Sequence, residues 1–277
     1  VDPECGSALK ELENIYRAGA DFAELSDILS RRAEIEHSMD VKRDLLGEVA
    51  HISLDNLEDS RAAIEAWKAI LEFAGDDQEA LEMLSGLYEM EEEWEEYINI
   101  QEQLVTVASP EDQIEIKHRI GDILVNKLEE GGRAIDVYQD VLDLDPANEE
   151  ALDNLEQIYT DREEWASVQE ILLRRLEGKD PLERIPIFFQ LAELAANQEN
   201  TEESLNYYHQ VLDLEPTNLD AVGRLEWLLR ESGKWYELVE VHRKHAEIKA
   251  ADGDTTAEVE QLVAASAVWN DKLENPE

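Results

Sequence analysis

The sequence predicts an all-α fold in which antiparallel helix pairs follow one another along the chain. Apolar residues recur at helical spacing, as in Ile135, Tyr138, Val141 and Leu142, which fall on one helix face. Related segments recur at a nearly constant interval. Short polar stretches with Gly or Pro separate these segments, and strand-like alternation is absent.

The interval is set by four pairs that join Ala to an aliphatic residue. They begin at Ala8, Ala80, Ala151 and Ala221, so they are 72, 71 and 70 residues apart. Aromatic residues follow in register. This indicates a two-part super-repeat of about 71 residues, because a fixed period is the signature of a repeat architecture. We predict units at 8–79, 80–150, 151–220 and 221–277, with the last incomplete.

Each unit yields helices in the same order. First helices of a pair are predicted at the segments ALKELENIY, ALEMLSGLY, ALDNLEQIY and AVGRLEWLL. Second helices of a pair are predicted at AAIEAWKAILEFAGDD, RAIDVYQDVLDLDPAN and ESLNYYHQVLDLEPTN. Pro146 and Pro216 end two of these, because proline disfavours helix at the residue before it. The pattern predicts about fifteen helices of roughly 11 to 17 residues, joined by short loops.

The second-helix segments carry a code of small and large residues. In GRAIDVYQDVLDLDPAN, Ala134, Tyr138 and Pro146 hold the small, aromatic and proline positions, and Ser204 and Tyr208 repeat the pattern. These residues resemble the tetratricopeptide repeat, whose unit has about 34 residues and two helices. The resemblance implies one right-handed α-α superhelical solenoid over residues 1–277 that binds other proteins.

The charge balance bears on partners. Asp and Glu number 68 against 24 Lys and Arg, which gives a formal net charge of -44. Nucleic acid is not expected as a partner, because binding to phosphates requires basic residues. Anionic membrane surfaces are excluded for the same reason. A basic protein partner, a saline environment and solubility remain as explanations of the charge.

The compartment is expected to be the cytoplasm. Cys5 is the single cysteine, so no internal disulfide is possible. No apolar run approaches the roughly 18 residues of a membrane span, and the N-terminus lacks a signal-peptide pattern. The chain begins with Val1, which suggests a processed or excised segment whose targeting signal would not be visible.

No enzymatic activity is expected. The chain has no GxGxxG, GxxxxGK[ST], GxSxG or HExxH motif and no CxxC pair, so neither a cofactor nor a metal site is predicted. The acidic run at 91–96 is interpreted as a solvated helix start. His242 and His245, three residues apart on a predicted helix, are interpreted as surface residues.

The resemblance also implies a concave groove lined by first-helix positions. A clamp for C-terminal carboxylates is rejected, because only Lys10 and Asn14 match its basic and amide residues. Trp227 stands where sister units carry Gly86 and Gln157, which suggests an exposed anchor for a partner. By register, acids are the commonest kind of residue among the groove positions: Glu82, Gly86, Glu89, His118, Asp122, Asp153, Gln157, Phe189, Glu193, Trp227 and Arg230.

We therefore expect a non-catalytic scaffold that binds a basic or amphipathic peptide or helix in an acidic groove. A structural spacer within a larger repeat protein, a chaperone or sequestering factor for basic proteins, and adaptation to a saline cytoplasm are the alternatives. The last predicted helix, near 259–273, has an apolar face without a second helix to cover it. An array needs a polar cap, so end-to-end self-association is a further expectation.

Overall fold

The structure, a computed structural model, describes residues 3–273 and shows only helices, turns and loops in that range. The all-α prediction, with about fifteen helices in pairs, is confirmed. Contacts divide the chain into two compact units, Val1–Pro146 and Ala147–Glu277, which are treated separately. The expectations for Val1, the Cys5 side chain and residues 274–277 lie outside the described residues.

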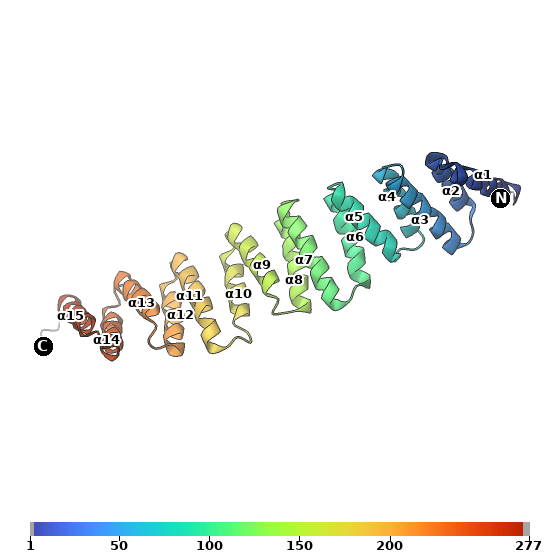
Figure 1. The fold of residues 1–277 in the computed structure, drawn as a ribbon. Helices are drawn as coiled ribbons and strands as arrows, with labels where there is room; N and C mark the ends of the chain where they lie inside the picture. The colour runs from blue at the N-terminus through green and yellow to red at the C-terminus, as the bar shows by residue number, and fades with distance from the viewer. Residues whose placement is uncertain (1–2, 274–277) are drawn as a thin grey trace. The chain divides into compact units, whose positions relative to one another are not determined.

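The first unit contains eight helices within its described residues (Figure 1). Each helix packs against the next one in the chain, and short loops make neighbours antiparallel. Their bounds are α1 Pro3–Gly19, α2 Phe22–Ile35, α3 Met39–Asp55, α4 Ser60–Leu71, α5 Gln78–Met90, α6 Trp94–Val107, α7 Pro110–Asn126 and α8 Gly131–Leu144.

The second unit follows the same plan over its described residues, with seven helices that pack in sequence order. The odd-numbered helices are the first members of each pair in both units. Their bounds are α9 Glu149–Asp161, α10 Trp165–Arg175, α11 Pro181–Asn197, α12 Thr201–Leu214, α13 Leu219–Glu231, α14 Trp235–Ala251 and α15 Thr255–Lys272.

Three first helices begin with the same capping arrangement. The side chains of Asp77, Asn148 and Asn218 each accept a hydrogen bond from a backbone N–H three residues on, at 2.9, 3.0 and 2.9 Å. A side-chain oxygen at this position satisfies an N–H group that the helix itself leaves unpaired. The alanine that provides this N–H is fully buried in all three helices.

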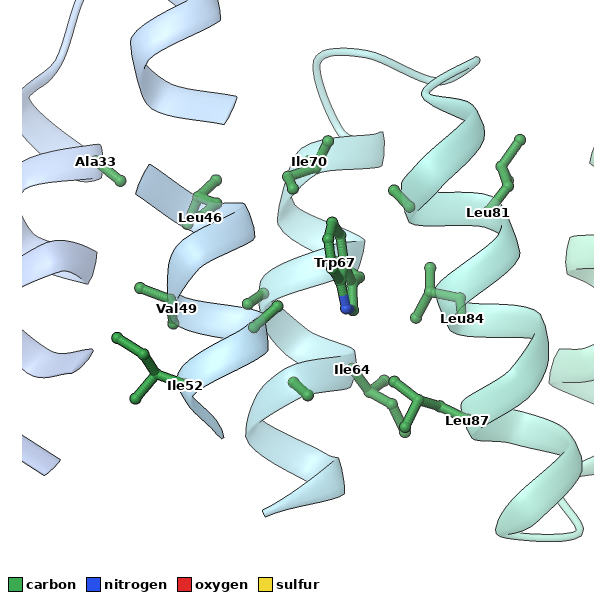
Figure 2. Packing of buried hydrophobic residues seen from close by; sticks show 14 of the residues in the cluster. Ala33, Leu46, Val49, Ile52, Ile64, Trp67, Ile70, Leu81, Leu84 and Leu87 are labelled. Carbon is green, nitrogen blue, oxygen red and sulfur yellow. The ribbon is translucent and has the colours of Figure 1, made fainter. Parts of the chain in front are cut away.

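The core of the first unit is centred on second-helix aromatics. Trp67 of α4 is fully buried, and Figure 2 shows it between Leu46 on α3 and Leu84 on α5. The edge of its ring lies against Gly47, where an added Cβ would lie 3.8 Å from the indole. His51 meets the same ring edge-on, with ring centroids 5.3 Å apart. One large side chain thus joins three consecutive helices.

The pair α7 and α8 makes a closer approach. A Cβ placed on Gly121 would collide with the ring of Tyr138, so only glycine fits at this point. The Tyr138 hydroxyl donates a hydrogen bond to Asp122 at 2.8 Å. Ala192 is the corresponding small residue of α11, and the Ser204 hydroxyl donates to its carbonyl oxygen at 2.8 Å. In these two pairs, a small residue of the first helix lies where the second helix approaches most closely.

The turns inside the pairs use a left-handed backbone. Glu58, Glu92, Glu129, Glu163 and Glu199 have φ between 54° and 58°, and each lies between the first and second helix of a pair. Gly233 holds this position between α13 and α14, with φ of 68°. Side chains with a Cβ pay a steric cost there that glycine avoids. The intrinsic backbone preference of glutamate therefore does not explain its presence at these positions.

We expect Glu129→Gly to raise the urea midpoint of unfolding, with a gain of up to about 1 kcal/mol, because it removes a left-handed residue with a Cβ. The matched control is Glu170→Gly, an exposed position inside α10. It should lower the midpoint, since glycine in a helix interior costs about 1 kcal/mol. Circular dichroism measures both. Destabilisation by both variants would mean that the Glu129 side chain stabilises the turn by more than its strain.

Candidate partner-binding surface

The predicted groove positions all lie on first helices, α5 and α7 in the first unit and α9, α11 and α13 in the second. Phe189 is partly buried and His118 is buried. The other nine positions are exposed: Glu82, Gly86, Glu89, Asp122, Asp153, Gln157, Glu193, Trp227 and Arg230.

In the first unit, Glu82, Gly86 and Glu89 share one face of α5, because residues three and four apart are neighbours on a helix. Asp122 on α7 is exposed and accepts the Tyr138 hydroxyl hydrogen bond. His118 is 7% exposed and packs beside Tyr138, with ring centroids 5.9 Å apart. His118 therefore belongs to the interior of the α7–α8 pair and is not a surface residue.

In the second unit, α11 and α13 each supply an aromatic and a charged residue. Phe189 packs edge-on against Tyr208, with centroids 5.6 Å apart. Glu193 forms an ion pair with Arg224 of α13 at 3.2 Å. Trp227, one turn beyond Arg224, is 57% exposed. The indole of Trp227 is thus accessible to solvent, whereas Phe189 is partly buried against Tyr208.

Arg175 is a component that sequence reasoning missed. It lies in the last turn of α10, its side chain is 13% exposed, and it contacts three acids of α9: Asp153 at 2.5 Å, Glu156 at 3.0 Å and Glu149 at 4.0 Å. The predicted groove residue Asp153 is therefore already paired. The doublet of arginines at 174 and 175 in so acidic a chain was the available signal.

Arg43 has a comparable role between α3 and α5. Its guanidinium contacts Asp77 at 2.9 Å and Glu79 at 2.5 Å. Hydrogen bonds from Arg43 hold the pKa of the Asp77 carboxyl below its ordinary value of 3.8, although burial acts in the opposite direction. Because Asp77 also caps α5, this one guanidinium fixes the start of the helix that carries Glu82 and Glu89.

A cleft of about 630 Å³ opens in the first unit between α5, α6 and α7. Of the predicted residues only Glu82 lines it. Its other acidic lining residues, Asp76, Asp112 and Glu115, flank or belong to α5 and α7. Sequence reasoning missed these positions because it considered the first-helix positions that line the expected concave groove and not the space between neighbouring pairs.

A second hollow of similar size lies between α12 and α14. Three acids line it, Glu237, Glu240 and Glu247, but so do the basic Arg243 and Lys244. The near balance of charge gives this hollow less preference for a cationic ligand than the cleft between α5 and α7 has.

Two histidines and one glutamate form a cluster in the second unit. His242 and His245 of α14 place Nδ1 atoms 3.2 and 2.7 Å from Oε1 of Glu226 on α13. His242 Nδ1 also lies 2.8 Å from Oε1 of Gln261 on α15. The interpretation of His242 as a surface residue was wrong: it is 2% exposed, because α15 covers this side of α14.

The cluster shifts the pKa values of His242 and Glu226. The hydrogen bond to Glu226 raises the pKa of His242 above 6.5, although burial lowers it. Burial raises the pKa of Glu226, but hydrogen bonds from His242 and His245 outweigh this and hold the pKa below 4.5. Arg230 is the nearby cation that opposes protonation of His242. The charged pair is thus favoured between these two pKa values.

The stability of the second unit should follow this pair. Because its folded pKa is raised, His242 stabilises the fold fully below pH 6.5, and this contribution is lost as pH rises through the raised pKa. Glu226, with a lowered folded pKa, loses its contribution as pH falls through that value.

We expect the unfolding free energy of the wild type to exceed that of His242→Gln by on the order of 1 kcal/mol near pH 6, with the gap closing by about pH 9. Urea titrations across this range measure the gap. His209→Gln, at an exposed histidine of α12, is the control. Parallel pH profiles for the wild type and His242→Gln would contradict the expectation.

Within residues 3–273, no three His, Cys, Asp or Glu side chains form a group that could hold a metal ion. In the same range, every helix is too short or too polar to cross a bilayer.

Comparisons with known protein families give a match for one segment of the chain. The family model described as tetratricopeptide repeat matches residues 185–218, which cover most of α11, all of α12 and the cap of α13. This is the segment in which Ser204 and Tyr208 hold the small and aromatic positions. No curated protein sequence matches the chain.

Several solved structures are similar. YrrB, described as a TPR protein with an unusual peptide-binding site, is 17% identical, with a TM-score of 0.33 over 60% of this chain and 95% of that one. A tetratricopeptide repeat protein from Parabacteroides merdae is 13% identical, with a TM-score of 0.35 over 98% and 96%. PilF of Pseudomonas aeruginosa is 15% identical, with a TM-score of 0.33 over 79% and 95%.

The matched repeat at 185–218 lies among antiparallel helix pairs in the second unit, and the first unit is built from pairs of the same kind. Residues 185–218 therefore form a tetratricopeptide repeat.

Proposed function

We propose that this protein-interaction scaffold binds a basic, amphipathic peptide or helix of a partner protein through the exposed surfaces of its first helices. The observation that carries the proposal is the exposure of Trp227 on α13 beside charged first-helix residues. A large aromatic side chain that is left accessible on a rigid helix is a common anchor for a partner. Arg224 and Arg230 flank it on the same helix.

Charge supports a basic partner. The chain carries 68 acidic against 24 basic side chains, and several basic side chains already contact acids of their own unit, as Arg43, Arg175 and Arg224 do. Glu82, Glu89 and Asp122 remain exposed on α5 and α7. Opposite charge accelerates association and selects against acidic partners. The helices are held by their own packing, so binding requires little ordering of the scaffold.

A peptide of about sixteen residues with alternating lysine and leucine faces should therefore bind more weakly as salt rises from about 0.05 to 0.5 M. Trp227→Ala should raise Kd about tenfold or more, because it removes the aromatic anchor. Trp165→Ala is the matched control, since Trp165 is 39% exposed but begins the second helix α10. Fluorescence anisotropy of the labelled peptide measures each Kd.

A peptide with glutamate in place of lysine should not bind. A Kd that changes neither with salt concentration nor with Trp227→Ala would contradict the proposed binding surface. Equal binding of unstructured polylysine and the amphipathic peptide would instead favour a sequestering role toward basic proteins, because only charge would then be recognised.

We also propose that copies of the chain associate end to end. On α15, Val259, Leu262 and Val263 are 57, 46 and 62% exposed and fall on one face. On α1, Leu12 and Ile15 are 37 and 63% exposed. Contact of unlike apolar faces on two copies is head-to-tail, and it continues into longer assemblies if it does not close.

Light scattering after gel filtration should then show a molar mass that rises with protein concentration. Val263→Glu and Ile15→Glu should each suppress the rise, because each places a charge in the apolar contact. Met90→Glu is the control, since Met90 is 75% exposed at the end of α5 and away from both faces. A constant monomer mass for the wild type would refute this association.

A further inference from the structure

The cleft between α5, α6 and α7 combines three features that together specify a ligand. One is an apolar wall, one is an acidic rim and one is a buried acceptor that lacks a donor. None of these features involves Trp227 or the second unit, so the cleft is a separate site from the surface around α13.

The apolar wall comes from the C-terminal half of α6 and the N-terminal half of α7. Leu104 and Val107 of α6 and Ile116 of α7 line the cleft. Val107 is 55% exposed, so part of this wall is open to solvent. Such a surface suits the methylene stem of a long side chain, or an apolar neighbour of it on a partner helix.

The rim of the cleft is acidic. Asp76, Glu82, Asp112 and Glu115 line it, and Arg119 is the one basic lining residue. Arg119 already pairs with Glu115 at 3.1 Å. Because carboxylates outnumber the guanidinium, the cleft attracts a cation and disfavours an anion.

Gln101 forms the polar floor of the cleft. It is 1% exposed, and its Nε2 donates a hydrogen bond to Ser85 Oγ at 2.6 Å. Its Oε1 is also buried, and among the described residues no donor reaches it. A buried acceptor without a partner costs free energy, which a bound donor can recover. A floor of this kind favours a ligand that brings N–H groups.

We propose that this cleft binds a lysine or arginine side chain of an amphipathic segment on the partner protein. The apolar stem of that side chain lies along Leu104 and Ile116, its N–H group donates to Gln101 Oε1, and the acidic rim balances its charge. The inference rests on the proposed class of partner, but it assigns a different site for the contact.

Gln101→Met is the first test, because it keeps the length of the side chain and removes the acceptor. It should weaken binding of the lysine–leucine peptide about tenfold. The unfolding midpoint of the free protein should change little, because loss of the unpaired buried Oε1 offsets loss of the hydrogen bond to Ser85. Gln101→Glu should strengthen binding several-fold, because it puts a charge beside the bound cation. Gln103→Met, at an exposed position of α6, is the control.

A double-mutant cycle locates the contact. Norleucine is substituted at each lysine of the peptide in turn. For one of these peptides only, Gln101→Met should no longer weaken binding, because the lysine that contacts Gln101 has been replaced. Isothermal titration calorimetry gives the Kd values. Circular dichroism of every variant confirms that the fold is retained.

The two proposals fail separately. If Gln101→Met weakens binding of the peptide and Trp227→Ala has no effect, the proposed binding surface on α13 is refuted and the proposed binding in the cleft stands. If Trp227→Ala weakens binding and Gln101→Met has no effect, the proposed binding in the cleft is refuted and the α13 surface stands. Unchanged affinity for Gln101→Met, Gln101→Glu and Glu82→Gln together would overturn the assignment of the cleft.

Discussion

The helix pairs α3–α4 and α7–α8 depend on the contact between a glycine on the first helix and a large ring on the second. Gly47 meets Trp67, and Gly121 meets Tyr138 so closely that no Cβ fits between them. Aromatic rings bury large areas, so each such contact stabilises a pair strongly. The same rings reach the next pair, as Trp67 does toward Leu84 on α5. The exposed first-helix side chains are held in place by this buried seam.

Electrostatics has a different role in this chain. With 68 acidic and 24 basic side chains, cations are scarce, and several are placed between neighbouring helices or pairs. Arg43 joins α3 to the cap of α5, Arg175 joins α10 to α9, and Arg224 joins α13 to α11. A guanidinium that makes two such contacts is preorganised by its planar shape. Carboxylates outnumber basic groups among the remaining charged side chains, so the net field that a partner meets is negative.

The sequence predicted the helices well because their signals are local. Spacing of apolar residues, Asn and Asp caps, and Pro146 and Pro216 are all read within one turn or loop. It predicted the exposure of Trp227 by comparison with Gly86 and Gln157. It missed the burial of His118 and His242 and the unpaired Oε1 atom of Gln101, because these depend on which neighbouring helix covers a residue. The cleft between α5 and α7 arises only from tertiary packing, so no pattern within one helix indicates it.

Packing between consecutive helices also determines how the chain can acquire its structure. Within each unit every helix finds its main neighbours immediately before and after it in the chain, so few long loops must close before contacts form. Local contacts of this kind allow rapid folding from more than one starting point. During synthesis on the ribosome, each hairpin can form as soon as its second helix has emerged, and it then offers a template for the hairpin that follows.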